Sequence, residues 1–252
     1  MFQRLIKNDL KENKVSMLVI GLFLLLTLTL SFAATRLTVS LSNSIERFVE
    51  TAKSPHLLQM HSGRVDRKRL QNFVQQHPEI ASWQLTDFVN VEGSAIRING
   101  QDSLQDSSQD NGFSSQNQNF DFLLDQYNQP AQPQPGQVYI PLYYYNSGKI
   151  KISDKIRVGS LQLTVQGFIR DAQMNAGLVS SKRFLISQTD LQTLKKEAVA
   201  SNENLIAFRV HKLSQISTIE QAYKNAELES NGPPMITYPT IKMINGFNDA
   251  LV

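Results

Sequence analysis

The sequence predicts an α+β protein that is anchored in a membrane by one N-terminal helix. Three observations support this fold class. An uncharged apolar run covers residues 15–34, two strand–helix–strand patterns begin near residues 56 and 204, and short alternating runs with Gly and Pro turns fill the segment between them. We therefore expect a body built from two distant halves with an insertion between them.

The apolar run is long enough to cross a bilayer. Residues 15–34 read VSMLVIGLFLLLTLTLSFAA, and a helix with a rise of about 1.5 Å per residue extends this run to about 30 Å. We place a transmembrane helix at 15–35. The alternative is a signal peptide cleaved near Ser31-Phe32-Ala33, but the apolar core is longer than a usual signal core and a helical pattern continues beyond it.

The charges beside this run predict its orientation. Basic residues concentrate before it, which favours a cytoplasmic N-terminus and an extracellular location for the chain from about residue 36. Residues 1–14 form an amphipathic pattern, which predicts either a cytoplasmic helix in the inner interface or a simple polar tail. The basic residues are Arg4, Lys7, Lys11 and Lys14.

Helical spacing continues on the far side of the membrane. Apolar residues recur at intervals of four, four and three over 36–55, which predicts a stalk helix that transmits motion or acts as a spacer. A similar stripe over 239–252 predicts a returning stalk, and we expect the native chain to continue into a second membrane helix. The predicted stalk residues are Leu37, Leu41, Ile45 and Phe48, then Ile241, Ile244, Phe247 and Leu251.

Between the stalks, residues 56–92 and 199–238 predict a split α+β subdomain. Each half reads as strand, helix and strand, so the pair (βαβ + βαβ) predicts a ferredoxin-like arrangement assembled from distant segments. The expected strands are 56–61, 82–89, 204–210 and 235–238, and the expected helices are 65–76 and about 214–226.

Residues 93–198 predict a β-rich insertion. Its first part, 101–119, is rich in Ser, Asp, Gln and Asn and predicts a long polar loop, and residues 129–137 predict a Pro-rich turn region. The expected strands are 138–145, 149–152, 156–158, 161–169 and 183–186, followed by a short helix over 189–200.

Little in the sequence indicates catalysis. The chain has no Cys, no phosphate-binding G-x-x-x-x-G-K-[ST] loop and only four scattered histidines, and its net charge of +3 does not favour nucleic acid. We expect no catalytic, cofactor-binding or metal-binding residue and no enzymatic activity on this chain. Two weaker features remain. The basic cluster over 64–69 is either a solvated face or a contact with lipid head groups or a partner. The aromatic residues Tyr139, Tyr143, Tyr144 and Tyr145, with Phe168, form either a strand with one buried and one exposed face or a groove for a ligand.

Several segments together resemble the FtsX-like permease family, whose relatives include the MacB and LolC/LolE types. The chain order of anchor, stalk, split domain, insertion and returning stalk fits the family. Four segments are similar to Gram-positive members: FDFLLD (120–125), GQVYIPL (136–142), GFIRDAQMN (167–175) and SSKRF (180–184). One segment departs from the family, because this chain has Ser153-Asp154-Lys155 where the family often has Gly-Asp before a strand. The motif residues of unknown role are Phe120, Asp121, Phe122, Leu123, Met174, Asn175, Lys182 and Arg183.

The resemblance implies a permease subunit of an ABC transporter, represented by its N-terminal membrane helix and extracellular domain. It implies a separate ATPase subunit that carries ATP and Mg, a second permease copy or a homologous permease, and a lipid bilayer around the helices. The function implied is coupling of ATP hydrolysis to export, extraction or sensing of a membrane-active substrate. The alternative is the sensory ectodomain of a receptor with two membrane helices.

Overall fold

The computed structural model describes residues 14–105, 108–175, 177 and 179–249. The amphipathic segment predicted for 1–14 lies outside the described residues except for Lys14, as does Leu251, and nothing is described of the side chain of Phe247. Two units make up the chain, residues 1–44 and residues 45–252, and each is described by itself.

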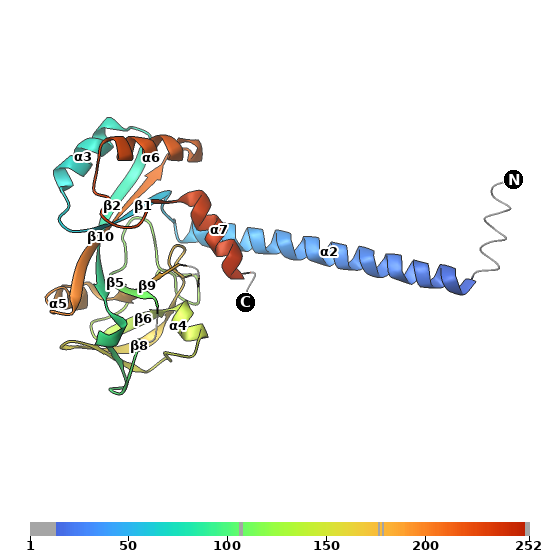
Figure 1. The fold of residues 1–252 in the computed structure, drawn as a ribbon, viewed down its shortest axis with the longest axis horizontal. Helices are drawn as coiled ribbons and strands as arrows, with labels where there is room; N and C mark the ends of the chain where they lie inside the picture. The colour runs from blue at the N-terminus through green and yellow to red at the C-terminus, as the bar shows by residue number, and fades with distance from the viewer. Residues whose placement is uncertain (1–13, 106–107, 176, 178, 250–252) are drawn as a thin grey trace. The chain divides into compact units, whose positions relative to one another are not determined.

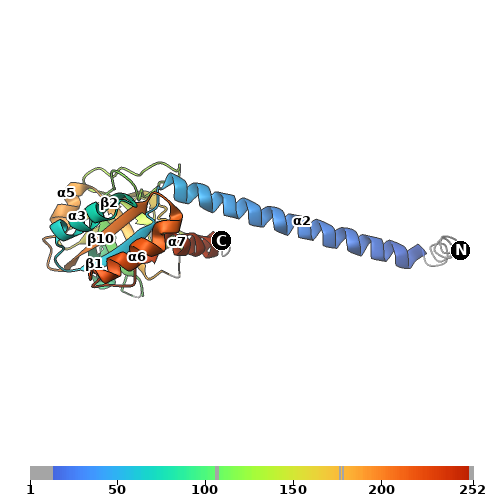
Figure 2. The same ribbon diagram turned by 90° about the horizontal axis from the view of Figure 1, so that it is seen from above.

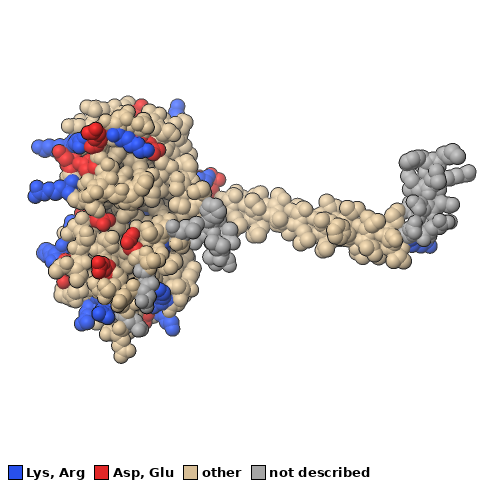
Figure 3. Space-filling model, viewed as in Figure 1, with Lys and Arg blue, Asp and Glu red and all other residues tan. Residues whose placement is uncertain are grey.

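The anchor and the predicted stalk are one helix, α2 (Lys14–Thr51), of 38 residues (Figure 1). Within the described residues it is the one helix long and apolar enough to cross a membrane. The face drawn in Figure 3 is almost free of charge along the apolar run. Thr29, Thr35 and Thr38 donate their hydroxyls to carbonyls one turn back, at 2.8–2.9 Å. Each of these exposed hydroxyls is thereby satisfied within the helix.

The two strand–helix–strand units are present and share one sheet. Their strands are adjacent in the order β11-β1-β10-β2, and every neighbouring pair is antiparallel. Strands β1 and β2 are therefore parallel to each other with β10 between them, which is the split βαβ arrangement predicted from the sequence. The units are β1 (Leu57–Ser62), α3 (Arg67–Gln76) and β2 (Ile80–Val91), then β10 (Ala200–Val210), α6 (Ile216–Asn225) and β11 (Ile236–Thr237), with a 3-10 turn at Leu213–Gln215.

Both faces of this part of the sheet are buried. Helices α3 and α6 cover one face, where Phe73 and Tyr223 pack on Phe208 (Figures 1 and 2). On the other face, alternate residues such as Leu205 and Ala207 pack against loop residues of the insertion. Burial on both faces explains why β10 carries a nearly continuous apolar run rather than strict alternation.

The insertion extends the same sheet to eleven strands, in the order β11-β1-β10-β2-β5-β9-β6-β8-β7-β3-β4. Its core consists of apolar residues from the C-terminal end of β2, from β3 and from β5 to β9, closed by Tyr144 and Leu191 from two short helices. The elements are a 3-10 turn (Gly93–Ala95), β3 (Ile96–Ile98), β4 (Asp102–Ser103), β5 (Asp110–Ser114), β6 (Gln137–Pro141), α4 (Leu142–Asn146), β7 (Lys155–Val158), β8 (Leu161–Ile169), β9 (Ser181–Ile186) and α5 (Gln188–Leu194).

The prediction of a polar loop over 101–119 was wrong in part, because it contains β5. This strand pairs with β2 on one side and in parallel with β9 on the other. Its polar residues Asn111 and Ser114 are buried, and Asn111 accepts a hydrogen bond from the Tyr144 hydroxyl. Gly112 is required there, since a Cβ at this position would lie 1.8 Å from the Phe88 ring.

Three further boundaries differ from the prediction. The strand expected over 138–145 ends at Pro141, and the three tyrosines that follow lie on α4. No strand forms over 149–152, because the Asp154 carboxylate accepts the Lys151 amide at 2.7 Å and closes a turn in which Ser153 has φ +76°. Helix α5 ends at Leu194, and residue 200 already belongs to β10.

Candidate functional site

Three of the four resemblance segments, far apart in the sequence, meet at the end of α2. Residues 115–125, residues 170–175 and β9 come together around Arg183, which is fully buried. Arg183 is the largest fully buried side chain of the described residues. It lies in β9, SKRFLI, whose six residues are all buried, so its charge must be compensated inside the protein.

Two carboxylates compensate this charge. Arg183 makes a bidentate contact with Asp171, from Nε to Oδ2 at 2.7 Å and from Nη2 to Oδ1 at 2.9 Å. Its Nη1 donates to Asp121 Oδ2 at 2.9 Å. Both aspartate side chains are almost fully buried. A bidentate Arg–carboxylate pair fixes orientation as well as charge, so the three residues hold three segments in one geometry.

Amide side chains complete the cluster. Asn117 Nδ2 donates to the Asp121 carbonyl at 2.9 Å and to its Oδ2 at 3.0 Å, and Gln173 Nε2 donates to Asp121 Oδ1. The backbone N–H of Gln173 donates to Asp171 Oδ1 at 2.8 Å. The carboxylate oxygens are thus satisfied by donors from three segments, which is the condition for a stable buried ionic network.

The cluster carries one carboxyl more than it has cations, and the pKa values reflect this. Burial, together with repulsion from Asp171, raises the pKa of Asp121 against the opposing effect of Arg183. Burial by itself disfavours the guanidinium, yet the two carboxylates raise the pKa of Arg183 above its ordinary value, so it stays charged. We interpret the network as an Arg183–Asp171 ion pair with Asp121 as the group closest to protonation.

The end of α2 is joined to this cluster by its backbone. After Thr51 the chain turns through Lys53, whose φ is +45°, and Ser54 N returns to Val49 O at 3.0 Å, as in a Schellman cap. The carbonyls of Ala52 and Lys53 then accept from Phe122 N at 2.7 Å and Asp121 N at 3.0 Å. The residue that ends the helix cap is therefore bonded directly to a member of the Arg183 network.

The second helix, α7 (Tyr238–Asp249), reaches the same place. Asn245 Nδ2 donates to the Ala172 carbonyl at 2.6 Å, next to Asp171, and Lys242 pairs with Glu46 of α2 at 3.3 Å. Side chains of α2, of α7 and of the two motif loops form one apolar cluster. Its buried members are Ile45, Val49, Ala52, Leu124, Ala172 and Ile241, with Phe48 and Phe122 half-buried. We call this cluster, with the Arg183 network beneath it, the junction.

The junction takes up some predicted residues and not others. Ile45, Phe48 and Ile241 from the predicted stalks pack in it and Ile244 is half-buried on α7, whereas Leu37 and Leu41 precede residue 45 on α2. Of the motif residues, Asp121, Phe122 and Arg183 belong to it. The other motif residues lie outside it. Phe120 and Met174 pack on the sheet, and Leu123 lies in a neighbouring apolar cluster. Asn175 is buried, and the Lys182 side chain contacts the Tyr143 ring.

Lys182 has its own environment. Its Nζ lies 4.8 Å from the centroid of the Tyr143 ring and donates to the Val179 carbonyl. Burial lowers the pKa of Lys182 to about 8, against the opposing charges of Asp171 and Asp110. Residues 176 and 178, close by in sequence, lie outside the described residues.

Two other candidate groups, the histidine His56 and the basic cluster over 64–69, make structural contacts. His56 accepts the Val210 amide at 3.0 Å, and burial with the charge of Arg209 lowers the pKa of His56 to about 4. Arg69 of the basic cluster donates to the carbonyls of Ala226 and Glu227 at the end of α6. Among the described residues, no three His, Asp or Glu side chains converge as a metal site would require.

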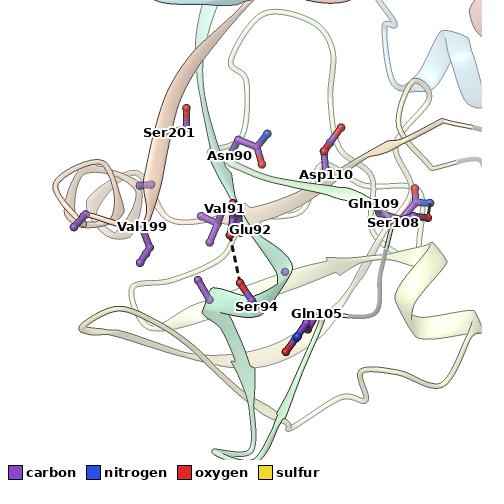
Figure 4. Close-up of a pocket in the computed structure, with 14 residues that line it drawn as sticks. Asn90, Val91, Glu92, Ser94, Gln105, Ser108, Gln109, Asp110, Val199 and Ser201 are labelled. Atoms are coloured by element: carbon purple, nitrogen blue, oxygen red, sulfur yellow. Dashed lines mark hydrogen bonds between the residues drawn. The ribbon is translucent and has the colours of Figure 1, made fainter.

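A cavity of about 940 Å³ lies where β2 ends and β10 begins (Figure 4). Its described lining includes two carboxylates, Glu92 and Asp110, and no basic side chain. Glu92 accepts a hydrogen bond from Ser94 at 3.4 Å, and the cavity borders the undescribed residues 106–107. The described lining holds no His, Lys or Arg, and the junction, which brings together residues of three resemblance segments, is the candidate site that we develop below.

Comparisons with known proteins give structural neighbours and no sequence match. No protein-family model matches the chain, and no curated protein matches it. The periplasmic region of MacB from Actinobacillus actinomycetemcomitans is 8% identical with a TM-score of 0.38, over 79% of this chain and 96% of that one. The extracellular domain of the noncanonic ABC-type transporter YknZ from Gram-positive bacteria is 12% identical with a TM-score of 0.35, and the match covers 72% of this chain and 98% of that one. Because both TM-scores are below 0.5, the proposals below rest on the chain's own residues.

Proposed function

We propose that this chain is the membrane-anchored N-terminal part of a permease subunit of an ABC transporter. Helix α2 is long and apolar enough to span a bilayer, and the four segments quoted above resemble FtsX-like permeases. In this proposal the N-terminus is cytoplasmic and the α+β body is extracellular. A separate ATPase subunit binds ATP and Mg, and a second permease copy or a homologous permease completes the transporter.

One observation carries the mechanical part of the proposal: the end of α2 and the side chains of α7 contact the same buried network. The cap of α2 is bonded to the backbone at Asp121, and α7 is bonded to the carbonyl beside Asp171. Arg183 links these two aspartates and lies in β9, within the large sheet. A displacement of either helix end is therefore passed to the sheet through buried, satisfied contacts rather than through a flexible loop.

The first experiment tests the transporter class. The full-length protein is purified in mild detergent from its native membranes, and the preparation is assayed for ATP hydrolysis and for a co-purifying ATPase subunit. We expect a stoichiometric ATPase whose activity is abolished when its own phosphate-binding lysine is replaced. A preparation that contains no ATPase but does contain a downstream signalling protein would favour the two-helix receptor.

The second experiment tests coupling through the junction. A spin label at Ser108→Cys, in a chain that has no native cysteine, reports distances between two permease copies in nanodiscs. We expect a change in this distance on addition of ATP and vanadate. Asn245→Ala, which removes the bond from α7 to Ala172, should reduce this change while ATP hydrolysis continues.

The matched control is Asn111→Ala, since Asn111 is a similarly buried amide that bonds Tyr144 inside the insertion and contacts neither helix. It should leave the nucleotide-dependent change intact. If Asn245→Ala behaves like Asn111→Ala, the junction does not transmit motion.

A further inference from the structure

A small cavity in the insertion is walled by aromatic rings. It has a volume of about 290 Å³ and lies between the turn 125–129 and strands β6 and β8. Tyr127, Tyr139 and Phe168 supply three rings to its lining. Asp125 is the one charged residue among the described lining residues. The lining thus combines π faces with a single negative charge.

The Asp125 carboxylate is held in place through one of its two oxygens. Asp125 Oδ1 accepts the amides of Tyr127 at 2.8 Å and Gln129 at 2.9 Å, which fixes the turn. Its other oxygen, Oδ2, accepts no hydrogen bond from the described part of the chain. A carboxylate oxygen beside a cavity retains the capacity to bind a cation or a donor.

Two of the three rings, those of Phe168 and Tyr139, are also held in place. Phe168 stacks on Tyr145 with ring centroids 4.5 Å apart and an angle of 28°. Gly167 lies under Tyr139, where a Cβ would be 3.2 Å from the ring, so the absence of a side chain lets the ring lie close to β8. Burial and the nearby charge of Asp125 raise the pKa of Tyr139, which keeps its phenol neutral.

We propose that this cavity binds the head group of an organic cation, such as a quaternary ammonium or a guanidinium. Aromatic faces attract cations electrostatically, and the effect increases when the cation is shielded from water. The carboxylate supplies a full negative charge. The cavity lies at the lower end of the range for ligand pockets, about 300–1,000 Å³, so it fits a head group rather than a whole large ligand. The proposal holds whether the chain serves a transporter or a receptor.

A titration of the full chain in nanodiscs, followed by ligand-observed NMR, tests whether this cavity binds an organic cation. Choline is the probe, and 3,3-dimethyl-1-butanol is its neutral isostere with the same shape. We expect saturable binding of choline and at least about threefold weaker binding of the isostere, because the isostere lacks the charge that the rings and the carboxylate attract. Equal binding of the two compounds would overturn the proposal. A parallel titration with n-butylguanidinium distinguishes an arginine-like ligand from a choline-like one.

Two variants locate the binding. Asp125→Asn removes the charge and keeps an oxygen for the turn, and Tyr127→Leu removes a ring that is 73% exposed and contributes little to the core. Each should weaken choline binding about three- to thirtyfold. Glu92→Gln, which neutralises a carboxylate in the other cavity, is the matched control and should bind like the parent. Unchanged binding in both variants would also overturn the proposal.

Discussion

At the scale of single residues, the decisive feature is a buried arginine with two aspartates. Removing a charge from water is costly, and the cost is offset only when partners and geometry are good. Arg183 meets this condition through a bidentate contact with Asp171 and a second contact with Asp121. The network therefore specifies how three chain segments meet, and its loss leaves charges uncompensated.

We predict that Arg183→Met strongly destabilises the extracellular body. It leaves two buried carboxyl groups without their cation, and breaking a buried ion pair in this way typically costs about 3–5 kcal/mol. Urea unfolding of the full chain, followed by fluorescence of Trp83, the single tryptophan, measures the change. Arg157→Met, on an exposed position of β7, should change the free energy of unfolding by less than about 0.5 kcal/mol. Similar values for the two variants would contradict the assigned role of Arg183.

We predict that Asp121→Asn gains stability relative to the parent as pH rises. Because the pKa of Asp121 is raised above its ordinary 3.8 in the folded state, its stabilising contribution is complete below that value and is lost as pH rises through the folded pKa. Asn cannot ionise and avoids this loss, and it tolerates the positive φ of +59° at this position. Urea unfolding of both proteins from pH 3.5 upward measures the difference. A difference that is constant, or that falls with pH, would refute the assignment.

At the scale of elements, α2 is one uninterrupted helix from Lys14 to Thr51, and its end is capped by Lys53 in the left-handed region. A continuous helix transmits displacement along its axis because each turn is bonded to the next. The backbone bonds from Ala52 and Lys53 to the motif loop extend this continuity into the body. In the proposed mechanism, the helix and the motif loop act as one mechanical element.

We predict that Leu41→Pro uncouples this element without unfolding the body. A proline in a helix interior removes a backbone hydrogen bond and costs about 3 kcal/mol or more. Leu41 precedes the compact unit that starts at Ile45, so the core contacts of that unit are retained. In cells that express the full transporter, surface expression and ATPase assembly should be preserved while substrate-dependent transport falls. Leu41→Ala keeps the helix and should transport nearly normally. If the proline variant transports like the parent, α2 acts only as a spacer and the mechanical role is wrong.

At the scale of the whole molecule, residues 45–252 form one unit with one eleven-stranded sheet. Strands β2 and β10 pair over most of their length and extend to the insertion, where β2 also pairs with β5. The split half and the insertion are therefore joined by continuous strands rather than by a linker. We expect this unit to respond as a single body to displacement at the junction.

We predict that the body lies outside the cell. Ser107, in the polar tract, lies outside the described residues, so the neighbouring exposed Ser108 is the better position for a label. In a chain without cysteines, Ser108→Cys should react with a membrane-impermeant maleimide in intact cells that lack an outer membrane. The cysteine-free parent is the control for background labelling. Reaction only after lysis would show the opposite orientation.

The sequence by itself predicted the features that depend on local pattern. The apolar run, the helical stripe beyond it and the two strand–helix–strand units all follow from spacing along the chain, and the structure has the predicted sheet arrangement. The motif segments were noticed through resemblance, but their roles were not assigned. Arg183 is preceded by Ser181 and Lys182 in SKRFLI, so the sequence pattern alone did not single it out as the buried charge.

Only the tertiary structure decided which residues meet. Asp121 and Arg183 are 62 positions apart and Asn245 is 73 positions from Ala172, so no local period connects them. The polar residues of β5 form a strand because β2 and β9 offer backbone partners on both sides, which outweighs a composition typical of loops. The junction and the aromatic cavity arise in the same way, from side chains that long-range strand pairing brings together.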